Sequence, residues 1–246
     1  MRFVHRAKSC DVLVFLMIVR ALLLLCFALL AATPRATALI VPFTEDFTTG
    51  ASNWLNGSSA APTWSATGGV DDGGYISAPG AISAGGFGTI VFRGNAAADA
   101  SGDAFVGNWL TGGVSTFSAF VRHDAPVALN FYARLDAGSG RAASSVDFSV
   151  PVGGWFQLNI PITEASFQSY GAAGTGTAAF NMVFSGITNV QVALSSTQDP
   201  STAGQTYNVS LDRVSTVPEP RTISLLSLAS IVWFAFRRRA LGPKRG

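Results

Sequence analysis

VALNFYARLD, residues 127–136, decides the fold class, because apolar and polar side chains alternate along it. Successive side chains of a strand point to opposite faces, so a period of two predicts one buried face and one wet face. The same period recurs in four later segments, at 146–150, 156–162, 190–194 and 207–211. The region between the two chain ends is therefore expected to be all-β.

Turn-forming glycines separate these short segments. Gly112-Gly113, Gly138-Ser139-Gly140 and Gly153-Gly154 lie between expected strands, a pattern typical of an antiparallel sandwich or barrel. Further strands are expected at 89–93, 104–110 and 115–122, and residues 53–88 are expected to be mostly loop with short extended pieces. We expect 171–179 to be a mobile connection, and no stretch predicts a long amphipathic helix.

The charge of the middle region argues against one class of partner. The whole chain has a formal charge of +2, but residues 39–216 hold 12 Asp and Glu, 5 Arg and no Lys, so 5 minus 12 gives −7. An acidic domain without a basic patch is not expected to bind nucleic acid. Both cysteines, Cys10 and Cys26, precede this region, so the domain cannot contain a disulfide.

The first 38 residues have the features of a signal peptide. An apolar stretch at 21–32 follows Arg20 and leads to Ala36-Thr37-Ala38, a small-x-small site of the kind that signal peptidase cuts. Cleavage is expected after Ala38, and a translation start at Met17 would give a leader of ordinary length. The alternative is a retained membrane helix over 12–32, which Arg20 and the cleavage site make less favourable.

The last thirty residues combine three elements in order. Val217-Pro218-Glu219-Pro220 comes first, an apolar run at 222–236 follows, and Arg237-Arg238-Arg239 opens the basic tail 237–246. As a helix the run would reach ~22 Å, less than the roughly 30 Å of hydrocarbon in a bilayer, so it predicts a short transmembrane helix. The arginines are expected on the cytoplasmic side, which places the preceding domain across the membrane.

This tail resembles the PEP-CTERM sorting signal of Gram-negative bacteria, in which a Pro-Glu-Pro motif, a hydrophobic segment and a basic cluster end the protein. The resemblance implies cleavage near the motif by the membrane protease exosortase, followed by release or transfer to the cell surface or the exopolysaccharide matrix. The alternative is an ordinary single-pass anchor in which Pro-Glu-Pro occurs by chance.

Four short segments carry a second resemblance. They are FTEDF at 43–47 with Gly50 and Trp54 behind it, GGYI at 73–76, FVGNW at 105–109 and VSLDRV at 209–214. The first and last resemble the opening and closing strands of galactose-binding-like jelly rolls, which include many carbohydrate-binding modules and laminin IV-like domains. The resemblance implies a single antiparallel jelly-roll-like β-sandwich over 39–216, with its two chain ends side by side.

Such folds often bind a structural calcium ion where the chain ends meet, and the positions that match here are Glu45, Asp46 and Asp212. Hard oxygen ligands suit calcium or magnesium better than zinc. The alternative is that these carboxylates are solvated residues at strand edges. Asp71-Asp72, before Gly73-Gly74, indicates a turn or, alternatively, a second acidic site.

Aromatic side chains that face away from the core are the expected contacts for a sugar, because they join a flat apolar surface to a polar edge. Trp155 and Tyr132 are out of phase with the apolar residues of their segments, so we predict that these two bind the ligand. The alternative is that a second sheet or a loop covers the face on which they lie. Three other tryptophans are expected in the core: Trp54, Trp64 and Trp109.

No spacing of residues predicts a catalytic site. His123 is the single histidine of the domain and lies beside Asp124, but adjacent strand residues point to opposite faces, so the two are not a ready dyad. The expected function is non-catalytic: binding to, or cohering with, exopolysaccharide. A purely structural or adhesive matrix component is the alternative, and a secreted glycan hydrolase is a third.

Overall fold

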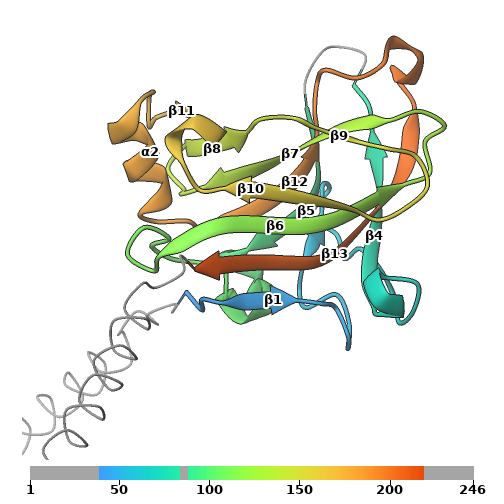
Figure 1. Ribbon diagram of the computed structural model, residues 1–246, viewed down its shortest axis with the longest axis horizontal. Helices are drawn as coiled ribbons and strands as arrows, with labels where there is room; N and C mark the ends of the chain where they lie inside the picture. Colours follow the sequence, from blue (N-terminus) through green and yellow to red (C-terminus); the bar gives the residue numbers. More distant parts are fainter. Residues whose placement is uncertain (1–38, 84–87, 219–246) are drawn as a thin grey trace, which may run out of the picture. The chain divides into compact units, whose positions relative to one another are not determined.

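A computed structural model describes residues 39–83 and 88–218, all within the unit Thr37–Gly246 (Figure 1). The predicted signal peptide, including Ala36 and Ala38, lies outside the described residues, as do Glu219, Pro220, the apolar run 222–236 and the arginines 237–239. Within the described ranges, no helix is both long enough and apolar enough to cross a membrane.

The described strands form two antiparallel sheets. Sheet A has the order β10-β6-β13-β4-β3, with β1 also paired to β13. Its strands are β1 (Phe43–Glu45), β3 (Thr63–Ser65), β4 (Tyr75–Ala81), β6 (Val114–His123), β10 (Phe156–Pro161) and β13 (Thr206–Pro218). Sheet B has the order β11-β8-β7-β12-β5-β2, with β9 also paired to β7. Its strands are β2 (Leu55–Asn56), β5 (Thr89–Asn95), β7 (Leu129–Asp136), β8 (Arg141–Ser145), β9 (Phe148–Val150), β11 (Phe167–Gly171) and β12 (Asn189–Leu194).

Helical segments are short. The helix α2 (Thr177–Phe184) packs against β8 and β11 of sheet B (Figure 1). Among the described residues, five short 3₁₀ helices connect strands: η1 (Val70–Asp72), η2 (Ala96–Ala98), η3 (Ala100–Asp103), η4 (Glu164–Ser166) and η5 (Pro200–Thr202).

The inward faces of the two sheets share one hydrophobic core. On β7 the alternation predicted from the sequence is observed, because Leu129, Phe131, Ala133 and Leu135 are all fully buried. They belong to the same apolar cluster as Val121 of β6 and Leu211 of β13 in the facing sheet. The expected antiparallel jelly-roll-like sandwich is thereby confirmed.

The two ends of the domain are adjacent, as predicted. β1 lies beside β13, with Phe43 opposite Thr216 (Figure 1). β13 continues to Pro218, which pairs with Val114, so the strand extends beyond the domain end predicted at Thr216. Val217 and Pro218 of the predicted sorting motif are therefore part of sheet A.

The tryptophans divide between core and surface. Trp54 and Trp109 are buried, as expected. The Trp54 indole lies against Gly94 of β5, where an added Cβ would come 2.8 Å from a ring carbon, so glycine permits this close approach. The prediction for Trp64 is wrong. This side chain is 39% exposed on β3, an edge strand of sheet A, and its Nε1 donates to the Phe47 carbonyl (2.7 Å).

Several local expectations are also wrong. Residues 104–110 contain no described strand and contribute one isolated bridge, from Gly107 to Ile187, because their apolar side chains fill the core from a loop. The segment 53–88 contains the expected short extended pieces β2 and β3, but also the seven-residue strand β4, and α2 begins within 171–179. Val146 precedes β9 and is exposed.

Candidate functional site

The outward face of β7 carries the candidate site. Tyr132, Arg134 and Asp136 alternate with the buried residues of this strand and therefore point away from the core. Gln191 of β12 lies opposite Arg134, and Arg93 of β5 lies opposite Gln191. Directly opposed residues share a face of a sheet, so a polar row crosses β7, β12 and β5.

Three side chains fix the Arg134 guanidinium. Its Nε donates to the hydroxyl of Tyr170 on β11, its Nη1 donates to Gln191 Oε1 (2.7 Å), and its Nη2 forms an ion pair with Asp136 Oδ2 (3.0 Å). Gln191 is only 1% exposed, so its Oε1 depends on a donor from the protein. A planar guanidinium held by three partners is a preorganised hydrogen-bonding group.

Two tyrosines flank this guanidinium. The Tyr170 ring centre lies 5.8 Å from Arg134 Cζ, and Tyr170 is 38% exposed. Tyr132 is half-buried, and its hydroxyl lies close to Gly88, where an added Cβ would be 2.7 Å away. Burial raises the pKa of the Tyr132 hydroxyl above its ordinary value, and the charge of Tyr170 adds to the rise. The hydroxyl groups of the two tyrosines are therefore close enough to interact electrostatically.

This arrangement can bind a ligand that has both hydroxyl groups and apolar ring faces. The tyrosine rings supply flat apolar surface with a polar edge. The guanidinium and the neighbouring polar groups supply directional hydrogen bonds at fixed positions, which select orientation.

Most of this site is not evident in the sequence. Arg134 and Asp136 share the phase of Tyr132, so the alternation alone could have placed them on the same face. Tyr170 and Gln191 come from strands that are distant in sequence, and only the register shows that they meet Arg134.

Trp155 lies on the other sheet, just before β10. Its ring meets Tyr75 of β4 edge to face, with 5.6 Å between centroids, and Arg122 Cζ of β6 lies 4.6 Å from its ring centre. Its Nε1 donates to the Gly68 carbonyl (3.2 Å). The two predicted ligand-binding residues, Trp155 and Tyr132, are therefore on different sheets and do not form one surface.

Glu45, one of the three predicted metal ligands, is turned toward a loop. It is 9% exposed, its Oε1 accepts from Phe47 N (2.9 Å), and its Oε2 accepts from the Ser101 hydroxyl (2.8 Å). Ser101 in turn accepts from Trp54 Nε1 (2.8 Å). Glu45 thus joins β1 to η3 and to the core tryptophan.

Asp212 and Asp46 interact electrostatically. Asp212 is 1% exposed and accepts from Val70 N (2.7 Å) and Arg213 N (2.6 Å). Burial raises the pKa of the Asp212 carboxyl above its ordinary value, and the charge of Asp46 adds to the rise, while these two hydrogen bonds and the Arg213 charge oppose it. Because the folded-state pKa is raised, the ionised form of Asp212 costs stability as the pH rises through that pKa.

Three oxygen atoms, from Asp212, Gly73 and Gly74, lie close to Gly69. A Cβ built on Gly69 would be 2.6 Å from Asp212 Oδ2 and 2.7 Å from the carbonyl oxygens of Gly73 and Gly74. These hard oxygen donors fit calcium chemistry. No group of three or more acidic, histidine or cysteine residues suited to a metal ion occurs in the described ranges, so an ion there would depend on backbone carbonyls.

The Asp71-Asp72 pair forms a turn. Both residues have left-handed backbone angles, with φ of 53° and 61°. Asp72 Oδ1 accepts from Gly68 N (3.0 Å), and Asp71 pairs with Arg213 (2.7 Å). The turn interpretation of this pair is supported.

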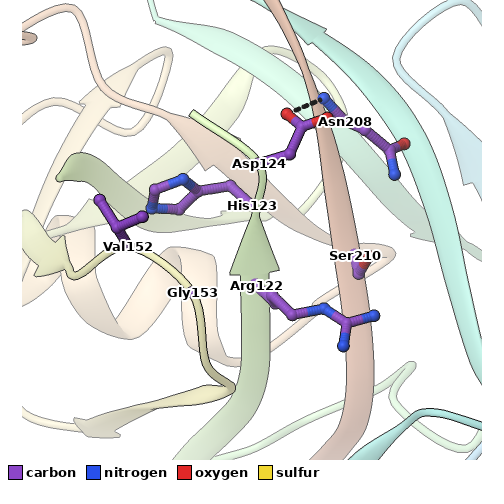
Figure 2. Close-up of a pocket in the computed structure, with 7 residues that line it drawn as sticks. All are labelled: Arg122, His123, Asp124, Val152, Gly153, Asn208 and Ser210. Atoms are coloured by element: carbon purple, nitrogen blue, oxygen red, sulfur yellow. Dashed lines mark hydrogen bonds between the residues drawn. The ribbon is translucent and has the colours of Figure 1, made fainter. Parts of the chain in front are cut away.

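His123 and Asp124 line a pocket of about 410 Å³ at the end of β6 (Figure 2). Figure 2 shows the His123 ring directed toward Val152 and the Arg122 side chain directed the opposite way. His123 Nε2 contacts the Val150 carbonyl (3.1 Å), whereas Asp124 Oδ1 accepts from Asn208 N (2.8 Å). As expected from their alternation, these two residues do not form an acid–base dyad.

Comparison with known proteins finds no matching family model and no matching curated protein. Among solved structures, the chain is similar to a family 11 carbohydrate-binding module of Clostridium thermocellum (13% identity, 73% of this chain, 97% of that chain, TM-score 0.43). It is also similar to an exo-β-agarase (11%, 74% and 26%, TM-score 0.43) and to the L4b domain of human laminin α2 (15%, 47% and 66%, TM-score 0.34). The chain spans 17%, 26% and 20% of the lengths of three larger matched structures, two of them agarases.

We predict that Arg134→Gln lowers the free energy of unfolding by about 1–3 kcal/mol, because it leaves the buried Gln191 Oε1 without its donor. Urea denaturation measures the change. The control is Arg141→Gln, because the Arg141 guanidinium bonds within the described ranges only to the carbonyls of Gly138 and Ala137, at long distances of 3.4 and 3.3 Å. Equal effects of the two substitutions would contradict the assigned role of Arg134.

Proposed function

We propose that this domain binds polysaccharide without catalysis, through the outward face of sheet B. The observation that carries the proposal is the Arg134 guanidinium, which Tyr170, Gln191 and Asp136 fix beside two tyrosine rings. Sugars present hydroxyl groups around apolar ring faces, and this surface offers matching hydrogen bonds and aromatic area. Trp155, on sheet A, is a separate candidate contact.

The proposal is non-catalytic because the candidate surface supplies binding groups without an evident acid and base. Glycoside hydrolysis requires two carboxyl groups that flank the scissile bond. The one carboxylate bonded within the site, Asp136, is engaged by Arg134. The proposed function is therefore recognition of a polysaccharide chain, or cohesion between polysaccharide chains.

Export is the second part of the proposal. The N-terminal 38 residues would be removed by signal peptidase, and the tail from Val217 would be cut by exosortase in a Gram-negative bacterium. The domain would then act at the cell surface or in the exopolysaccharide matrix. What supports this part is the order of motifs in the sequence.

Calcium as a structural ion is the third part. Asp212 and the carbonyls of Gly73 and Gly74 would hold the ion, with Asp46 nearby. Bound there, calcium would supply positive charge beside a buried carboxylate. Glu45 would act indirectly, by fixing β1 through Ser101.

Glycan binding can be tested with a glycan array followed by titration calorimetry on the polysaccharides that bind. Tyr132→Ala and Tyr170→Ala should each weaken binding by about tenfold, or about 1.4 kcal/mol, because each removes aromatic contact area. Met182→Ala is the matched control, since Met182 is an exposed apolar residue on α2. Unchanged affinity in both tyrosine variants would place the site elsewhere, and loss only in Trp155→Ala would assign it to sheet A.

A calcium titration followed by thermal melting tests the metal. We expect calcium to raise the Tm of the wild-type protein, because binding to the folded state alone stabilises it. The increase in Tm should disappear in Asp212→Asn and persist in Asp199→Asn. Asp199 is the exposed N-cap residue of η5. An equal rise in both variants, or none in the wild type, would remove the metal proposal.

Mass spectrometry of the native product tests export. The expected product begins at Leu39 and ends near Pro218-Glu219-Pro220. A protein that still carries both chain ends and resides in the cell interior would refute this part of the proposal. It would leave the sugar-binding part intact, because that part rests on the folded domain.

A further inference from the structure

Arg93 of β5 is a second guanidinium on the outward face of sheet B. It lies opposite Gln191, which separates it from Arg134 in the polar row. Neighbouring strands are ~4.8 Å apart, so two strand spacings place the backbones of the two arginines roughly 10 Å from each other. One extended ligand could therefore contact both.

The two arginines differ in how their charges are balanced. Arg134 pairs with Asp136, but neither of the two ion pairs among the described residues includes Arg93. Arg93 Nη2 donates to the Gly57 carbonyl at a long 3.3 Å. Its Nε is buried and has no hydrogen-bond partner among the described residues. Arg93 is thus a half-buried cation with unused hydrogen-bonding capacity.

A pocket of about 480 Å³ lies next to this guanidinium. Gly57, Ser58 and Thr89 line it from the side of sheet B, and Pro79 and Thr206 line it from sheet A. This volume is in the range of pockets that bind small ligands. The threonine and serine side chains add hydroxyl groups, and no acidic residue belongs to the lining. The chemistry of the pocket is that of a site for an anionic, hydroxyl-rich group.

We propose that the Arg93 pocket binds a carboxylate or sulfate group of an acidic polysaccharide that lies on the outward face of sheet B. This inference rests on the proposed sugar-binding function and specifies the class of sugar. An oxyanion is the natural partner of a guanidinium, because its two oxygens accept parallel N–H donors. Tyr132, Tyr170 and Arg134 would contact neutral parts of the same chain.

The overall charge of the domain makes this assignment more specific. With a net charge of −7 over residues 39–216, the domain repels polyanions at long range. At physiological ionic strength such repulsion is screened beyond about 8 Å. An acidic sugar would therefore bind where it meets a local cation without a counter-charge. Arg93, Arg122 and Arg141 all lie outside the ion pairs of the described residues, but Arg93 also lines a pocket without an acidic residue, whereas the pocket that Arg122 lines includes Asp124.

The test compares ligands that differ only in charge, by titration calorimetry on the purified full-length protein at physiological salt. Oligogalacturonate is compared with its methyl ester, and a sulfated carrageenan oligosaccharide with a neutral agarose oligosaccharide. We expect at least one anionic ligand to bind at least about tenfold more tightly than its neutral partner. The pair with the larger difference in affinity identifies carboxylate or sulfate as the group recognised.

Arg93→Gln should abolish this preference for charge, so that the charged and the neutral partner bind the variant with equal affinity. The control, Arg141→Gln, removes the same charge from β8 of sheet B and should retain the preference. Equal binding of charged and neutral partners by the wild type, or an unchanged preference in Arg93→Gln, would overturn the inference. Binding of no glycan at all would instead refute the proposed function. The comparison of ligands needs no variant, so it decides the inference even if Arg93→Gln does not fold.

Discussion

Packing between the inward faces of the two sheets is the constraint on which the rest of the structure depends. The domain contains no cysteine, so no disulfide can hold it, and its stability has to come from apolar burial. Leu129, Phe131 and Leu135 of β7 are fully buried in that interface. Because strand side chains alternate, the same packing forces Tyr132 and Arg134 to the opposite face. The candidate site is thus a consequence of how β7 is buried.

Periodicity in the sequence predicted the layered fold but not its details. The strand β7 could be predicted because apolar and polar residues alternate along it. The pairing of the domain's two ends could be predicted because the first and last strands resemble those of known jelly rolls. The length of β4 was underestimated, because Pro79 and Gly80 lie inside it and both residues are typical of turns. Trp54 and Trp64 could not be distinguished without knowing that Gly94 makes room for one of them and that the other lies on β3. Pairing between distant strands, which brings Tyr170 and Gln191 to Arg134, has no signal in a single sequence.

The two outward faces use their polar groups differently. On sheet A, Arg122 stacks on Trp155 and Tyr75. Asp212 accepts one backbone N–H from Val70 in η1 and one from Arg213 of its own strand. These groups mainly hold loops onto the sheet. On sheet B, Arg134 is fixed by side chains of three strands while Tyr170 remains exposed. Rigid groups next to exposed aromatic surface are better suited to recognition than groups already used for internal contacts.

Charge placement underlies the selectivity proposed for the outward face of sheet B. The domain has five arginines and no lysine against twelve acidic residues, so each arginine has carboxylates available to it in principle. Arg134 and Arg213 are paired, whereas Arg93, Arg122 and Arg141 take part in neither ion pair of the described residues. Of these three, Arg93 lies beside a pocket whose described lining has no acidic residue. Leaving a half-buried cation without a counter-charge costs stability in the free protein. A bound oxyanion would recover that cost only for ligands that carry the charge, which is how one residue can discriminate between otherwise similar sugars.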